Sequence, residues 1–322
     1  MSFTILGTGS CLPRRKVGNG ELARFLDTSD EWISQRVGIR ERRVCTTETT
    51  AELAFRAATA ALEMSGVQPQ MLDMIICATL SADNAAPSAA CSVQAMLGAQ
   101  CPAMDVNAAC SGFIYALETA AGFFARGAGR ILVIGAERLT RMVDWSDRST
   151  AVIFADGAGA MVLGKGDSYL SSKLCAKGDE NVLGIPNPAG NSPFYENEAA
   201  KPYIYMNGQE TFKFAVKSMC ADLAYVVGHA GLTIEEIAWI IPHQANARII
   251  DAAAKKLCIP TERCCKNIER VGNTSAASIP ILTDELCRSG KLRDGDKIAM
   301  CSFGAGLTSA ACVIKWEISN KQ

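Results

Sequence analysis

Of the fourteen cysteines in the chain, Cys110 has the sequence context best suited to chemistry. Residues 107–117 read NAACSGFIYAL, so small residues surround the cysteine, and an apolar helix is predicted to continue to about Arg126. Cys110 is therefore expected near the N-terminus of a helix, where unpaired backbone N–H groups and the helix dipole favour negative charge. Such a position lowers the pKa of a thiol and raises its nucleophilicity. The alternative interpretation is a buried cysteine packed by small neighbours.

His243 is the second candidate, and it is one of only two histidines. Residues 239–242 read WIIP and predict a buried strand that ends immediately before His243, with a helix following from about Asn246 to Leu257. A lone histidine at a strand end is more often structural than catalytic, and this interpretation stays open. His229 lies in a helix-end turn, is expected at the surface, and receives no role.

Two further segments combine small and polar residues. Residues 271–280 read VGNTSAASIP, where Gly272 permits a tight turn and Asn273 to Ser275 can cap the following helix. Residues 302–307 read SFGAGL, and the glycines allow backbone N–H groups to approach a ligand, as an oxyanion hole requires. Each segment alone has an ordinary explanation, a helix cap in the first case and a common glycine-rich turn in the second.

The elements that must position these residues come from an internal repeat. Residues 66–76 (GVQPQMLDMII) resemble residues 231–241 (GLTIEEIAWII) at an offset of 165 residues, close to half of the chain. Gly66 and Gly231 each stand where a helix end requires a positive φ. The predicted helices before them run from about Glu52 to Ser65 and from about Glu210 to Ala230. The predicted strands after them are Met74–Thr79 and Trp239–Pro242.

The ends of the two halves also match. Each half contains an apolar strand that runs into small residues and is followed by another strand. The strands are 131–136 and 160–163 in the first half, and 298–303 and 310–316 in the second. The pattern predicts two similar α/β halves with mixed sheets, residues 1–165 and 166–322, packed about a pseudo-twofold axis. A site is expected where the halves meet.

The bulk composition excludes several classes of protein. Apolar residues make up 49% of the 322 residues and charged residues 20%, a composition that is typical of a globular enzyme. The net charge of −1 gives no global attraction to nucleic acid or an anionic membrane. The N-terminus lacks the pattern of a secretory signal, and no apolar run is long enough to span a bilayer, so a cytoplasmic location is expected. Without a Cys-x-x-Cys pair, a zinc site is not expected.

Taken together, these segments resemble the β-ketoacyl-acyl-carrier-protein synthase III family, which initiates bacterial type II fatty acid synthesis. The resemblance covers essentially the whole chain, from TSDEWI (28–33) and RVGIRER (36–42) to the glycine-rich turn near the C-terminus. PHQAN (242–246) and GNTSAAS (272–278) are specific when they occur in this order. The resemblance implies a duplicated thiolase fold of five α-β-α-β-α layers, usually a homodimer, with coenzyme A thioesters as substrates and no cofactor or metal.

The resemblance also implies a role for each candidate. Cys110 is the nucleophile that becomes acylated. His243 and Asn273 point at the thioester oxygen of the second substrate and stabilise the enolate that decarboxylation leaves. The backbone N–H groups of Cys110 and Ala305 form the oxyanion hole.

Two binding regions follow from the same resemblance. The residues implied to bind coenzyme A are Thr28, Trp32, Arg36, Arg148, Gly208 and Asn246; Trp32 suits stacking on adenine and the arginines suit pairing with phosphates. The residues implied to contact the acidic carrier protein are Gln244, Ala245, Asn246, Ala247, Arg248 and Lys256. Arg248 and Lys255 share one helix face, which the pattern alone explains as a solvated surface.

The sequence departs from the common pattern of the family at Ala86. Many members carry a bulky aromatic residue there, which closes the acyl pocket across the dimer interface. A smaller side chain is expected to deepen that pocket, which puts a preference for acetyl as the primer in doubt.

The leading hypothesis is a decarboxylating Claisen condensation of an acyl-coenzyme A primer with a malonyl carrier-protein thioester. Elongating synthases of the same fold use two histidines, and biosynthetic thiolase needs a second cysteine near the C-terminus, which residues 302–306 lack. A specialised synthase of secondary metabolism, a thioester hydrolase and a non-catalytic acyl-binding protein are the remaining alternatives. Product analysis separates hydrolysis, which gives free acid, from condensation.

Overall fold

The first sheet carries five strands in the order β1-β7-β6-β4-β5. In this computed structural model, which describes residues 2–187, 194 and 201–318, the strands are β1 (Ser2–Cys11), β7 (Asp156–Gly166), β6 (Arg130–Arg138), β4 (Met74–Ala78) and β5 (Ala103–Val106). β7 pairs antiparallel with both β1 and β6, whereas β6, β4 and β5 run parallel. The sheet is therefore mixed, as predicted.

The second sheet repeats the arrangement of the first. Its strands are β8 (Tyr169–Ala176), β13 (Thr308–Lys315), β12 (Lys297–Gly304) and β11 (Trp239–Pro242), in that order. β13 pairs antiparallel with β8 and β12, and β12 runs parallel to β11. These directions match those of β1, β7, β6 and β4, so the internal repeat has a structural counterpart. β7 ends and β8 begins close to residue 165, where the division of the chain was predicted.

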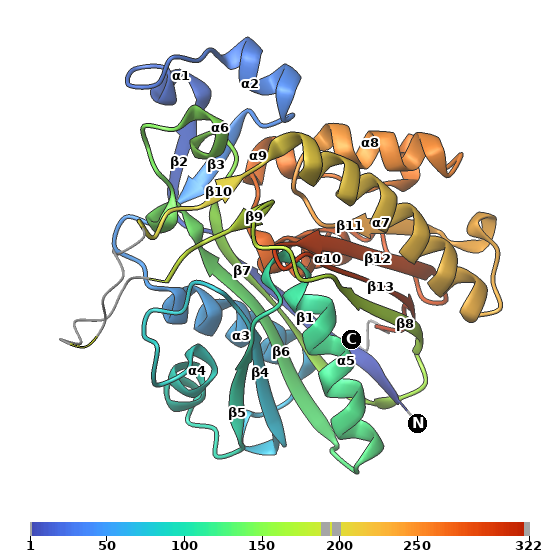
Figure 1. The fold of residues 1–322 in the computed structure, drawn as a ribbon. Helices are drawn as coiled ribbons and strands as arrows, with labels where there is room; N and C mark the ends of the chain where they lie inside the picture. Colours follow the sequence, from blue (N-terminus) through green and yellow to red (C-terminus); the bar gives the residue numbers. More distant parts are fainter. Residues whose placement is uncertain (1, 188–193, 195–200, 319–322) are drawn as a thin grey trace.

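Helices and sheets alternate in five layers (Figure 1). α3 (Thr50–Ser65) and α4 (Ala89–Leu97) cover the outer face of the first sheet, and α7 (Gly208–His229) and α8 (Ala247–Lys256) cover that of the second. α5 (Gly112–Ala125) and α10 (Ser278–Arg288) lie between the sheets, where both sheets share one apolar core with them. This confirms the predicted five-layer thiolase fold.

The repeated segments are equivalent in three dimensions. Gly66 after α3 has φ 67° and Gly231 after α7 has φ 70°, so both glycines adopt the left-handed conformation that was predicted. The 3-10 turns η1 (Pro69–Met71) and η4 (Ile234–Glu236) follow, and then β4 and β11 begin. The offset of 165 residues therefore holds for the turns and for the strand starts.

The remaining elements are short. They are β2 (Arg15–Gly18) paired with β3 (Glu41–Val44), α1 (Asn19–Leu22), α2 (Asp30–Arg36), α6 (Arg148–Ala151), β9 (Leu183–Gly184) paired with β10 (Tyr205–Met206), α9 (Ile268–Val271), and the turns η2 (Ala109–Ser111), η3 (Leu139–Met142), η5 (Thr261–Arg263) and η6 (Ser275–Ala277). Several of them share an apolar cluster built around Leu22, Ile33, Ile153 and Ile204. None of the helices in the described ranges is long and apolar enough to cross a membrane.

Candidate active site

Cys110 lies in the turn η2, immediately before α5, and is 9% exposed. Because α5 begins at Gly112, Cys110 lies near the N-terminus of the helix, as predicted. Two cavities meet at this residue, one of about 710 Å³ and one of about 100 Å³. The thiol is thus buried within the protein yet adjacent to space for a ligand.

The pKa of Cys110 departs from the prediction. The pKa is raised to about 12, mainly by burial; the Ser275 hydroxyl and the cysteine's own backbone N–H lower it, and the carboxyl of Glu137 raises it. The predicted lowering at a helix N-terminus is wrong for this site, because loss of solvation outweighs the favourable backbone groups. The free thiol is neutral at pH 7 and needs a group that takes its proton when it attacks.

His243 follows β11 and is 1% exposed. Its Nδ1 lies 2.7 Å from the Ser278 hydroxyl, which also accepts the Gln244 N–H at 3.3 Å. Among the described residues, Nδ1 is the only acceptor within reach of the Ser278 hydrogen, which favours the tautomer with the proton on Nε2. Burial lowers the pKa of His243 to about 3, so the ring is a neutral donor at pH 7.

Asn273 follows a tight turn and lines the small cavity. Gly272 precedes it with φ 76°, and a Cβ there would lie 2.9 Å from the Ala155 Cβ, so the turn requires glycine. The Asn273 Oδ1 accepts the Ser275 N–H at 2.8 Å, which leaves the Nδ2 group as the donor for a ligand. The predicted capping of the following helix by residues 273–275 is wrong, because the N-cap of α10 is Ala277 and no side chain caps it.

Cys110, His243 and Asn273 all line the cavity of about 100 Å³. They come from three separate segments, and each was singled out from the sequence. The ring of Phe303 meets His243 edge-on with centroids 5.5 Å apart and closes one side. Nε2 of His243 has no hydrogen-bond partner among the described residues, so the cavity holds an unsatisfied donor beside a buried thiol.

The glycine-rich turn packs directly against the cysteine. A Cβ on Gly304 would lie 2.7 Å from the Cys110 backbone nitrogen, so only glycine fits there. Ala305 lines the larger cavity together with Cys110. The predicted oxyanion hole therefore has both of its residues at the cavity wall.

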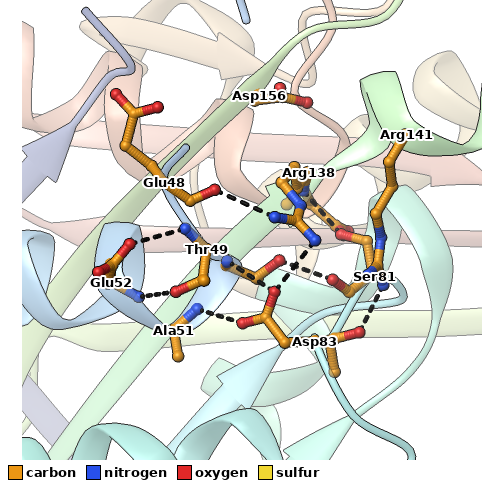
Figure 2. A network of polar contacts seen from close by, with 12 residues as sticks. Glu48, Thr49, Ala51, Glu52, Ser81, Asp83, Arg138, Arg141 and Asp156 are labelled. Atoms are coloured by element: carbon orange, nitrogen blue, oxygen red, sulfur yellow. Dashed lines mark hydrogen bonds and ion pairs between the residues drawn. The ribbon is translucent and has the colours of Figure 1, made fainter. Parts of the chain in front are cut away.

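The larger cavity is bounded by the loop that follows β4. Asp83 fixes this loop by accepting the N–H groups of Thr50 and Ala51 at 3.0 and 2.9 Å and by facing the Arg138 guanidinium at 3.4 Å (Figure 2). The hydroxyl of Ser81 accepts the Arg138 N–H at 2.8 Å. These contacts hold the loop in place at the edge of the larger cavity.

Ala86 does not line the cavity of its own chain. The loop residues Asn84 and Ala85 do, whereas Ala86 is exposed. An effect of Ala86 on the acyl pocket therefore requires a second copy of the chain, as the family resemblance implied.

Four of the six residues predicted to bind coenzyme A lie outside the small cavity: Thr28, Trp32, Arg36 and Arg148. The guanidinium carbons of Arg36 and Arg148 lie 5.9 and 5.1 Å from the centroid of the Trp32 ring. Arg148 also pairs with Asp27 at 3.2 Å, and the Thr28 hydroxyl is buried without a hydrogen-bond partner among the described residues. This combination of an aromatic face and two guanidiniums fits a nucleotide that carries phosphates.

Gly208 and Asn246 line the small cavity itself. Asn246 donates to the Arg36 carbonyl at 3.2 Å and accepts the Arg248 N–H at 2.9 Å, which caps α8. Asn246 therefore ties the coenzyme A region to the start of α8.

The structure corrects one predicted carrier-protein contact. The side chain of Gln244 is 0% exposed: its Nε2 donates to the Pro242 carbonyl at 2.8 Å and its Oε1 accepts the Asn267 N–H at 3.0 Å. A side chain used in this way is not available to a docking protein. Ala245 is 9% exposed and faces the small cavity.

Within this predicted surface, Arg248 and Lys256 remain accessible, Asn246 and Ala247 are half-buried, and Ala245 is buried. Arg248, Lys255 and Lys256 are exposed on α8, and Ala247 packs against Gly38, where a Cβ would lie 2.5 Å from the Ala247 Cβ. Arg248 lies two residues after Asn246, which lines the small cavity, whereas Lys255 and Lys256 lie at the other end of α8.

Three buried polar residues near the cysteine were not predicted: Glu137, Ser275 and Ser278. Glu137 had a visible signal, because it is a charged residue directly after the apolar run ILVIGA of β6. The serines had none, since small polar residues in a turn usually cap helices. Among the described residues, no group of three His, Cys, Asp or Glu side chains is placed to hold a metal ion.

The duplicated five-layer architecture, with a cysteine, a histidine and an asparagine around one cavity, defines a protein of the thiolase fold. Residues 104–178 match the family model described as 3-oxoacyl-acyl-carrier-protein (ACP) synthase III, and residues 227–316 match the model of its C-terminal part. The chain belongs to the β-ketoacyl-acyl-carrier-protein synthase III family.

Similar proteins cover almost the whole chain. The β-ketoacyl-acyl-carrier-protein synthase III of Clostridium acetobutylicum is 45% identical over 98% of this chain and 99% of its own length. The crystal structure of 3-oxoacyl-acyl-carrier-protein synthase III from Aquifex aeolicus superposes with a TM-score of 0.92 at 45% identity, over 98% of this chain and 100% of that one. The priming β-ketosynthase of the R1128 polyketide biosynthetic pathway also has a TM-score of 0.92, at 33% identity over 98% and 96% of the two chains.

Proposed function

We propose that this chain joins an acyl group from acyl-coenzyme A to a malonyl-acyl-carrier-protein thioester, releases CO2, and so initiates fatty acid biosynthesis in the cytoplasm. The observation that carries the proposal is the shared cavity: the Cys110 thiol, the His243 Nε2 and the Asn273 amide line one small space. Family membership at 45% identity to named synthases supports it. All fourteen cysteines lie in the described ranges and are free thiols, which suits a reducing compartment.

In the first half-reaction, the Cys110 sulfur attacks the acyl thioester and coenzyme A leaves. The backbone N–H groups of Cys110 and Ala305 hold the developing oxyanion. In the second, the neutral His243 and the Asn273 amide donate hydrogen bonds to the malonyl thioester oxygen, so that loss of CO2 leaves a stabilised enolate. The enolate carbon then attacks the acyl group on Cys110, which releases the 3-oxoacyl product and the free cysteine.

Substrate binding uses the surface around Trp32. The aromatic ring and the guanidiniums of Arg36 and Arg148 receive the nucleotide of coenzyme A, with Thr28, Gly208 and Asn246 along the route to Cys110. The carrier protein docks on Arg248 and Lys256, beside Asn246 and Ala247. The active enzyme is a homodimer in which residues 1–165 and 166–322 of each chain form the two halves.

Product analysis tests this function. Purified protein is incubated with acetyl- or longer acyl-coenzyme A and a malonyl carrier protein, and the products are identified by mass spectrometry. A 3-oxoacyl carrier protein and CO2 are expected. Free acid and coenzyme A without a new carbon–carbon bond would show a hydrolase instead.

A second candidate is supported by the similarity to the priming β-ketosynthase of a polyketide pathway. The same chemistry would then supply a primer for secondary metabolism. The discriminating measurement is complementation: a strain that lacks its own initiating synthase grows with this chain only if the product enters fatty acid synthesis.

Reversing the charge of Arg248 is expected to weaken the use of malonyl carrier protein far more than that of malonyl-coenzyme A. Arg248→Glu places an anion on the exposed face of α8, where an acidic partner would be repelled. The KM for malonyl carrier protein should rise by roughly tenfold, the effect of about 1.4 kcal/mol. Arg126→Glu, at the far end of α5, is the matched control. Equal losses with both malonyl donors would contradict a carrier-specific role.

Replacing Ala86 by a larger residue is expected to narrow the range of acyl-coenzyme A primers that the enzyme accepts. Each methylene buried in the pocket contributes about 0.8 kcal/mol, and one methylene commonly changes discrimination by roughly tenfold or more. Ala86→Phe should therefore reduce activity with longer or branched primers and spare acetyl-coenzyme A. Ala85→Phe, which alters the wall of the chain's own cavity, is the comparison. If Ala86→Phe has no effect, Ala86 does not set the pocket depth, whatever Ala85→Phe does.

A further inference from the structure

The proposed function leaves the proton of the Cys110 thiol without a destination. The pKa of the thiol is raised to about 12, so the proton is present when the acyl thioester arrives. His243 is poorly placed to take it, because the tautomer favoured by Ser278 already carries its proton on Nε2. A different acceptor must lie close to the sulfur.

Glu137 is the buried carboxyl in this region. It lies near the end of β6, is 0% exposed, and its Oε2 accepts the Leu80 N–H at 3.2 Å, the Thr79 hydroxyl at 3.4 Å and the Ser81 hydroxyl. Its Oε1 is buried without a hydrogen bond to any described residue. One oxygen therefore anchors the loop after β4, and the carboxyl also lies near the Ser275 hydroxyl and the Ala276 N–H, both of which lower its pKa.

Ser275 lies between this carboxyl and the cysteine. Its hydroxyl lowers the pKa of both Cys110 and Glu137, although it forms no hydrogen bond of ordinary geometry with a described residue. The hydroxyl therefore lies near both groups. Ser275 also lines the larger cavity beside Cys110.

The backbone holds Ser275 in this place. Its φ of 49° is a left-handed conformation that is unusual for a residue with a side chain, and its N–H is held by the Asn273 Oδ1 at 2.8 Å. The turn is pressed against β6, since a Cβ on Gly135 would lie 2.5 Å from the Ala276 carbonyl oxygen. Such strain persists where the surrounding structure enforces it, and it is common at functional sites.

We propose that Ser275 and Glu137 form a relay that takes the thiol proton from Cys110 during acylation and returns it after condensation. This inference rests on the proposed function. The sulfur forms a bond to the acyl carbon, and the bond from that carbon to the coenzyme A sulfur breaks. The thiol proton passes to the Ser275 oxygen while the Ser275 proton passes to the Oε1 of Glu137. Coenzyme A leaves as a thiolate and is protonated by solvent. When the enolate displaces Cys110, the sulfur regains the proton by the reverse path.

The surroundings suit a group that changes charge near neutral pH. Burial raises the pKa of Glu137 to about 7, while the hydrogen bonds to its oxygens lower it. The titratable and charged groups that face it are Cys77 on β4, Cys110 before α5 and Arg141 in η3. Because only ionised Glu137 accepts a proton, the acylation rate is expected to rise as the pH increases through about 7 and to level off above it.

Glu137→Gln tests the relay, because an amide still accepts the bonds of Leu80 and Ser81 but takes no proton. Single-turnover acylation of Cys110 by acyl-coenzyme A, followed by intact mass, should slow by about 10²-fold, and the rise near pH 7 should disappear. Ser275→Ala should cause a similar loss with Glu137 intact, and the double variant should be no slower than either single variant. Glu118→Gln, on α5, removes a carboxylate that accepts the Tyr169 hydroxyl at 2.9 Å and is the matched control with unchanged acylation.

Three outcomes would overturn the relay. Glu137→Gln could acylate at the wild-type rate with the wild-type pH profile. Alternatively, Glu137→Gln could be slow and Ser275→Ala normal, which would make Glu137 an anchor for the loop alone. A wild-type protein that takes no acyl group onto Cys110 would instead refute the proposed function, and the relay with it. Thermal unfolding of each variant identifies any that fails to fold.

Discussion

Cys110→Ala is expected to abolish condensation, on the order of 10⁴-fold or more, while the fold is retained. The side chain is small and already surrounded by small residues, so its removal changes little packing, whereas no other described thiol lines the cavity that His243 and Asn273 share. Radiolabelled acyl-coenzyme A should label the wild-type protein on Cys110 alone among the fourteen cysteines. The measurement is peptide mapping of the labelled protein.

The control for this experiment is Cys91→Ala. Cys91 is an exposed free thiol and is therefore a ready target for non-specific acylation. Its removal should leave both labelling and condensation intact. Acyl label that persists in Cys110→Ala under the same conditions would show that another residue is the nucleophile.

His243→Ala and Asn273→Ala are expected to separate the two half-reactions. In the proposed mechanism each variant removes one donor to the thioester oxygen, and loss of one such donor typically costs about 10²–10³-fold in rate. Both variants should still form the acyl-enzyme, because the proposed relay assigns the thiol proton to neither side chain. Decarboxylation of the malonyl thioester, measured as released CO2, should be lost. Since the pKa of His243 is about 3, this step should show no inflection near pH 6.5 from the imidazole.

The opposite result would reassign the histidine. A His243→Ala protein that decarboxylates normally but fails to accept an acyl group would make His243 the base for Cys110 and would also argue against the relay through Glu137. His229→Ala is the control, because that ring stacks on Tyr225 with centroids 4.1 Å apart and lies outside both cavities.

Much of the fold was predictable because it depends on local pattern. The apolar strands, the helix-ending glycines and the repeat at an offset of 165 residues are properties of short segments, and the sheet topology preserves them. Strand ends were less accurate: the strand predicted as 160–163 spans Asp156–Gly166, since pairing with two neighbours extends it beyond its apolar centre.

The site was predictable in its members but not in its electrostatics. The position near a helix N-terminus suggested a lowered pKa for Cys110. The pKa is raised instead, because the burial of η2 has a larger effect than the helix. The family resemblance assigned Gln244 to a docking surface, although its side chain turns inward and accepts the Asn267 N–H. Both errors arise from tertiary burial, which spacing along the chain does not encode.

The backbone around Asn273 links the two halves of the molecule. Its N–H donates to the Ile153 carbonyl at 3.1 Å and its carbonyl accepts the Ala155 N–H at 2.9 Å, so a residue of the second half forms an isolated parallel bridge with the segment just before β7 of the first. In hydrogen-exchange terms, the amides of Asn273 and Ala155 can open only when the contact between the halves opens. The two halves should therefore unfold as one cooperative unit, with no native-like half left behind. A displacement of Asn273 on substrate binding would therefore have to break hydrogen bonds between the two halves, and not only change one loop.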